Sequence, residues 1–86
     1  MDDQLYLAAL KIISLQKMVE VFKTNVEEMA QAKRIIDLLL EHFPGNKINF
    51  DLHDCDKILR VEGKSFAPEK IMTLVIENGF NCKILE

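Results

Sequence analysis

The sequence has few of the residues that mark the more specialised classes of protein. Only three glycines, two prolines and two cysteines occur among its 86 residues. These counts exclude a collagen-like chain, a low-complexity chain and a disulfide-rich secreted framework. The remaining composition, 49% hydrophobic and 29% charged, is typical of an ordinary globular domain. A chain of this length has room for one hydrophobic core and not for two.

Positive charge is also scarce. Eleven Lys and Arg residues stand against fourteen Asp and Glu residues, which leaves a net charge of −3 at pH 7. A nucleic-acid-binding domain normally carries a basic stripe. The sequence also has no Gly-rich phosphate loop and no basic–aromatic motif of the RNA-recognition type. We therefore expect no nucleic-acid partner.

No apolar run has the length of a membrane-spanning helix. The run from Leu5 to Leu15 covers 11 residues, whereas a spanning helix needs about 20. The chain opens Met1-Asp2-Asp3, without the basic stretch of a signal peptide or a lipidation motif. We expect no membrane association and a cytoplasmic location, where both cysteines stay reduced.

Residues 1–17 differ from the rest of the chain and are predicted to form an apolar, helical extension. Apolar residues recur at helical spacing and also fall between those positions, so a helix here would be apolar on most sides and would need a covering surface. Three interpretations are open. The segment covers a sheet face of its own chain, pairs with a second chain, or precedes a natural start at Met18.

From Met18 onward the hydrophobic pattern changes between the strand period and the helix period. Thr24 with Glu27, and Asn25 with Glu28, have the spacing of a capping box. Pro68 suits the first turn of a helix, and Asn78-Gly79 suits the end of one. The predicted elements are a strand at 18–23, a helix from about 25 to 43, strands at 47–52 and 57–62, a helix from 68 to about 78, and a strand at 80–85.

This order, βαββαβ, predicts an α+β domain at 18–86 of the ferredoxin-like type, a two-layer sandwich. Right-handed crossovers give an antiparallel sheet with the strand order 4-1-3-2 and both helices on one face. The other face is then left open, and Val21 or Phe22, with Ile58, would add apolar area to it.

The span from Met18 to Leu85 resembles the heavy-metal-associated domain family, which includes copper chaperones and the small domains of metal-pumping ATPases. The resemblance rests on the order and length of the elements, on the first strand running into a capped helix at Thr24-Asn25, and on Asn78-Gly79-Phe80 after the second helix. It implies the ferredoxin-like fold and a metal site in the first loop.

The metal-binding motif of that family, M-x-C-x-x-C, is absent. Asn25 and Glu28 stand where the resemblance would put the two cysteines. An amide and a carboxylate do not replace a thiolate pair for Cu(I). We therefore expect no metal or cofactor at this loop.

A second group of candidate ligands lies in the predicted hairpin turn, at His53, Asp54, Cys55 and Asp56. Imidazole, thiolate and carboxylate groups suit Zn(II), with Cu as a second candidate ion. In the predicted topology this turn lies at the same end of the sheet as Asn25, Glu28 and Asn78. The alternative interpretation is a solvated turn, since Asp and His are common in turns.

The sequence carries no constellation of a nucleophile, a base and an orienting group, so we expect no enzyme. The leading hypothesis is a small non-enzymatic binding or interaction module. Its partner would be a protein or a second copy of the chain, bound through the run from Leu5 to Leu15 or through the open sheet face. The alternatives are a metal-binding protein with ligands around His53 and Cys55, and a small-ligand regulatory domain.

Overall fold

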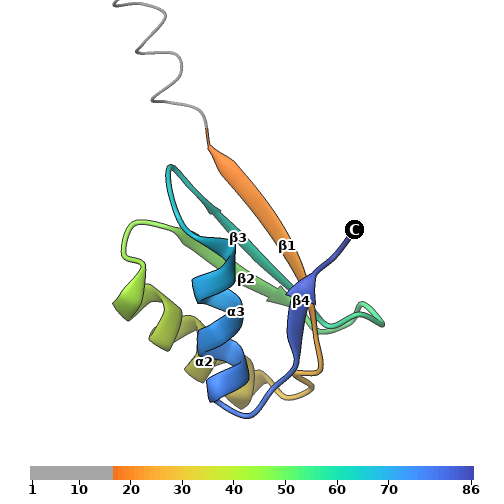
Figure 1. Cartoon of the computed structure of the whole chain (residues 1–86). Helices are drawn as coiled ribbons and strands as arrows, with labels where there is room; N and C mark the ends of the chain where they lie inside the picture. Colours follow the sequence, from red (N-terminus) through yellow and green to blue (C-terminus); the bar gives the residue numbers. More distant parts are fainter. Residues whose placement is uncertain (1–16) are drawn as a thin grey trace, which may run out of the picture.

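The computed structural model describes residues 17–86. The predicted extension, with its run from Leu5 to Leu15, lies outside the described residues except for Lys17. Figure 1 shows the elements in chain order, which are β1 (Met18–Thr24), α2 (Met29–His42), β2 (Lys47–Asp51), β3 (Ile58–Gly63), α3 (Pro68–Glu77) and β4 (Cys82–Ile84).

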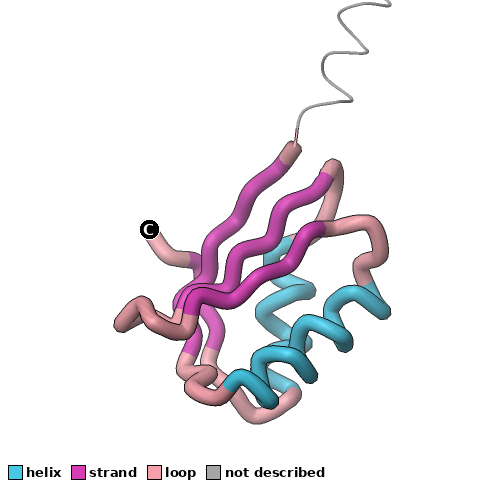
Figure 2. Tube along the Cα trace, turned by 180° about the vertical axis from the view of Figure 1, so that it is seen from behind, coloured by secondary structure: helices cyan, strands magenta, loops and turns pink. Residues whose placement is uncertain are grey.

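The four strands form one antiparallel sheet, in the order β2-β3-β1-β4. Read from the β4 edge, the same sheet has the order 4-1-3-2. Both helices lie on one side of the sheet, and Figure 2 shows the strands in front of α3, with α2 below them. The protein is therefore a small α+β structure of two layers. None of the elements in residues 17–86 covers the second face of the sheet, which we call the open face.

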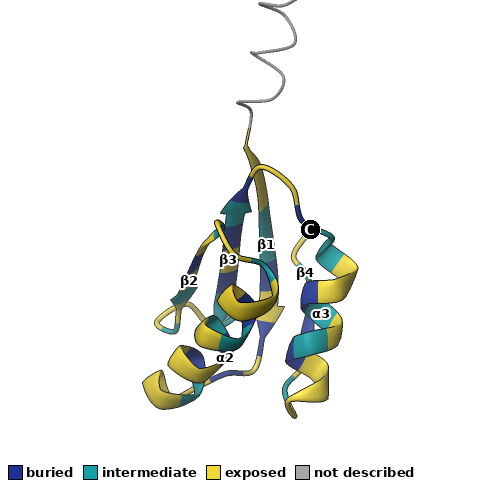
Figure 3. Ribbon diagram, turned by 90° about the vertical axis from the view of Figure 1, so that its left-hand side faces the viewer, coloured by how far each residue is buried: buried dark blue, intermediate teal, exposed yellow. Residues whose placement is uncertain are grey.

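The core lies between the sheet and the helices, because alternate strand residues point to alternate faces. Phe22, Leu59 and Val61 point toward the helices and are fully buried. They pack with apolar residues of the helices, namely Ile35, Leu39, Ile71 and Val75. Figure 3 shows buried positions on the strands and on both helices. The sequence left open whether Val21 or Phe22 would add apolar area to the open face. Phe22 is in the core, and Val21 is the one that faces away from the helices.

The start of α2 differs from the prediction. Neither Thr24 nor Asn25 caps the helix, which begins at Met29 with Glu28 as its N-cap. The reason is that Thr24 belongs to β1, where its hydroxyl donates to the carbonyl oxygen of Lys57. The Asn25 side chain accepts a hydrogen bond from the backbone of Asn81. Both cap candidates are therefore engaged elsewhere.

The second half of the chain follows the pattern more closely. Pro68 is the first residue of α3, and Gly79 has a φ of +94° at the helix end, as Asn78-Gly79 predicts. The last strand is shorter than expected. The amide of Phe80 donates to Val75 and that of Asn81 to Asn25, so the ladder with β1 begins only at Cys82. β3 starts at Ile58 because Lys57 has a φ of +46°, which a strand does not accommodate.

Candidate functional site at the end of β1

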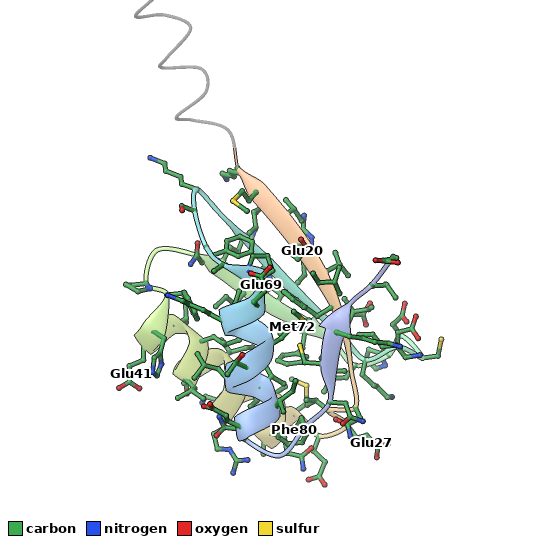
Figure 4. The ribbon with its side chains drawn as sticks, viewed as in Figure 1. Glu20, Glu27, Glu41, Glu69, Met72 and Phe80 are labelled. Carbon is green, nitrogen blue, oxygen red and sulfur yellow. The ribbon has the colours of Figure 1, made fainter. Side chains whose placement is uncertain are left out.

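The loop after β1 is tied to the strand that follows α3. The side-chain oxygen of Asn25 accepts a hydrogen bond from the backbone amide of Asn81 over 2.7 Å. Figure 4 shows Glu27, in this loop, and Phe80, which precedes Asn81, at the same end of the molecule. Asn25, which stands where the resemblance would put the first cysteine, therefore uses its side-chain oxygen to close a loop.

Glu28, the second position, belongs to the start of α2. Its backbone amide donates to the side-chain oxygen of Gln31 over 3.3 Å, which is one half of a capping box. A carboxylate here also lies at the positive end of the helix dipole, which stabilises it. The physical role of Glu28 is thus to start the helix.

The hairpin turn brings together three of its four candidate ligands. Single ligand atoms of Asp54, Cys55 and Asp56 lie within 4.8 Å of one another. His53 is not in this group, and its backbone amide donates to the carboxylate of Asp51. Cys55 is exposed. The structure therefore separates the predicted imidazole ligand from the thiol and the two carboxylates.

Both carboxylates of this group already have partners. One oxygen of Asp54 accepts the backbone amide of Asp56 over 2.8 Å. An oxygen of Asp56 lies 3.4 Å from Nζ of Lys23, on β1. The carbonyl of Asp56 also accepts the amide of Thr24. The turn is thereby fastened to the end of β1, as the predicted topology requires. Asn78 is the C-cap of α3, as predicted, and its side-chain amide donates to the carbonyl of Leu74.

A hollow of about 460 Å³ opens between the end of β1, β4 and the last turn of α3. It is lined by Lys23, Thr24, Asn25, Ile76, Asn81, Cys82 and Lys83. Burial raises the pKa of the Cys82 thiol to about 12, so this group stays protonated near neutral pH and is no nucleophile. Asn81 and Lys83 were not predicted as site residues, because only the β1–β4 register brings them beside Asn25 and Lys23.

The open face carries a short apolar strip where β1 and β4 meet. Val19 is 47% exposed and Leu85 is 38% exposed. Val21 belongs to the same strip, and its carbonyl accepts a hydrogen bond from the amide of Leu85. The strip is bordered by basic side chains at Lys23, Arg60 and Lys83, the second of which pairs with Glu62 at 3.5 Å. This surface has the composition of an apolar patch with a polar rim.

No protein-family model matches the chain, and no curated protein sequence shows significant similarity to it. Within residues 17–86, no helix has the length and hydropathy needed to cross a membrane.

Proposed function

We propose that the protein is a non-enzymatic interaction module, a ferredoxin-like domain that resembles heavy-metal-associated domains without their soft-metal site. The observation that carries this proposal is the bond between the Asn25 side chain and the Asn81 amide. At the position where a thiolate would hold a metal ion, the side chain instead stabilises the fold. Glu28, three residues on, starts a helix.

The module binds its partner through the open face. Support comes from the apolar strip of Val19, Val21 and Leu85, whose partial exposure leaves area for another protein to bury. Two of the three basic side chains around the strip, Lys23 and Arg60, already pair with Asp56 and Glu62, so burial of the apolar strip is the main attraction for a partner. Its area is small, so we expect a transient complex.

A titration of the full, reduced protein with Zn(II) and with Cu(I), followed by backbone amide shifts, tests the loss of the metal site. We expect no saturable shift at residues 25–28 with up to equimolar ion at micromolar concentration. A stoichiometric, saturable shift at these residues would overturn the proposal.

The second candidate function, a metal site in the hairpin turn, is favoured by the grouping of Asp54, Cys55 and Asp56. The same titration tests it, because shifts would then be confined to residues 53–56 and to Lys23, which pairs with Asp56. The variant Cys55→Ser removes the only soft ligand of this group and would abolish those shifts.

A further inference from the structure

The sheet has a free edge at β2. This five-residue strand pairs with β3 and with no other strand of residues 17–86, and Figure 3 shows it at the side of the sheet, next to α2. Its outer backbone amides and carbonyls thus have no strand partner. Such an edge is a template for pairing with another strand.

The sequence of β2, Lys-Ile-Asn-Phe-Asp, is complementary to itself in the antiparallel direction. Residues that face each other across an antiparallel pair point to the same side of the sheet. The two-fold axis that relates two copies of β2 must therefore pass between two copies of the same residue. An axis at Asn49 pairs all five positions. Lys47 then faces Asp51 of the second copy, and Ile48 faces Phe50 of the second copy. An axis at Ile48 or at Phe50 loses both charge pairs.

The flank of α2 beside this edge is apolar. Met29, Ile36 and Leu40 recur at helical spacing, and they are 76% exposed, half-buried and 38% exposed, respectively. A hollow of about 320 Å³ lies between the helix and β2, lined by Met29, Ala32, Lys33, Ile36, Asn49 and Phe50. The methylene stem of Lys33 can lie in this hollow while its ammonium group stays in water.

We propose that the protein forms a two-fold dimer through β2, so that two four-stranded sheets become one continuous sheet. An axis perpendicular to the sheet keeps both pairs of helices on the same side, and it brings the two copies of α2 alongside each other. Each contact then occurs twice, as in any isologous interface. The charge pairs set the register, and burial of Met29, Ile36 and Leu40 supplies apolar area.

This dimer goes beyond the proposed function and is independent of it. β2 forms one edge of the sheet, whereas the apolar strip lies at β1 and β4, toward the opposite edge. A monomeric protein could still bind a partner through the open face, and a dimer could form without one.

Sedimentation equilibrium of the full chain and of three charge variants tests the dimer. Lys47→Asp and Asp51→Lys each place like charges opposite each other, and the double variant restores opposite charges with the signs exchanged. We expect a dimer of the native chain, self-association weakened roughly tenfold or more in each single variant, and recovery in the double variant. An equimolar mixture of the two single variants should form a heterodimer.

Lys83→Asp is the matched control, because it makes the same charge change on the other edge strand, β4. It should leave the dimer unchanged, and far-UV circular dichroism should show all variants folded. A native chain that stays monomeric up to millimolar concentration would overturn the proposal. A dimer that no reversal at positions 47 and 51 weakens, or that Lys83→Asp weakens equally, would also overturn it.

Discussion

Thr24 is bonded to Lys57 across 33 positions of the chain, with the threonine hydroxyl donating to the lysine carbonyl oxygen over 2.5 Å. The same hydroxyl oxygen accepts the amide of Val26 over 3.2 Å. Thr24 is only 6% exposed, the one polar residue among those described that is buried. It joins the end of β1 to the start of β3, where the backbone of Lys57 has its positive φ.

Replacing Thr24 with valine should destabilise the protein by about 1–3 kcal/mol, because the substitution leaves a buried amide and a carbonyl without their partner while keeping the side-chain shape. Urea unfolding followed by circular dichroism measures the free energy of unfolding. Thr73→Val is the control, since the Thr73 hydroxyl bonds within α3 at an exposed position. Equal losses in the two variants would contradict this account.

Gly63 is buried at the end of β3, where there is no space for a side chain. A β-carbon at this position would overlap the side-chain oxygen of Asn46. The Asn46 side chain cannot move freely, since its amide donates to the carbonyl of Phe43 over 3.0 Å. We expect Gly63→Ala to lower the free energy of unfolding by about 1–3 kcal/mol.

A double-mutant cycle with Asn46→Ala identifies the cause of that loss. With the obstructing oxygen removed, Gly63→Ala should cost less than it does in the native chain, by about 0.5 kcal/mol or more. Strictly additive losses would show that the clash is not with Asn46.

The buried thiol of Cys82 should make the protein less stable at alkaline pH. Its pKa is about 12 in the folded protein and 9.0 as the ordinary value. Between these values the unfolded chain loses this proton and the folded chain keeps it. The free energy of unfolding therefore falls as the pH rises above about 9 and continues to fall until about 12. Below pH 8 this group gives no pH dependence.

Unfolding free energies of the native chain and of Cys82→Ala, each measured from pH 7.5 to 10.5, isolate this effect from other titrating groups. The native chain should lose stability relative to the variant as the pH rises. Parallel pH profiles would contradict burial as the cause. In the native state, a thiol reagent should modify Cys55, which is exposed, well before Cys82.

A thiolate pair should confer metal binding if the loop after β1 has the geometry that the resemblance implies. The double variant Asn25→Cys/Glu28→Cys recreates the C-x-x-C spacing at the end of β1. We expect it to take up one Cu(I) ion per chain in competition with a Cu(I) chelator, and the native chain to take up none under the same conditions.

The single variant Asn25→Cys is the control, because it loses the bond to Asn81 in the same way but offers only one thiolate at the loop. Failure of a folded double variant to compete for Cu(I) would mean that the backbone here does not bring positions 25 and 28 together around an ion.

Local sequence patterns predicted most of the helices and strands, because the conformation of each of these segments follows from the residues within it. Alternation at Ile48 and Phe50 indicates β2, and Pro68 with Gly79 indicates both ends of α3, where local backbone chemistry dominates. The start of α2 was mispredicted, since Thr24 and Asn25 form bonds with Lys57 and Asn81, residues far along the chain. Capping patterns do not reveal such competing partners.

The same limit applies to the candidate site. Asp54, Cys55 and Asp56 are consecutive, so their proximity follows from the sequence, whereas His53 in the same turn lies outside the group. The pairing of Lys23 with Asp56, and of Asn25 with Asn81, depends on strand register. Register follows from the packing of the whole sheet and is not a local property.

The bond from the Leu85 amide to the Val21 carbonyl determines where any peptide attached after Glu86 would begin. Figure 1 shows this terminus beside β1, away from the helices. An affinity tag or a fluorescent fusion joined at that point would therefore emerge next to Val19 and Leu85 and would hinder a protein binding there. An immobilisation handle on the exposed side of α3 avoids this obstruction, so surface-binding measurements should use that attachment.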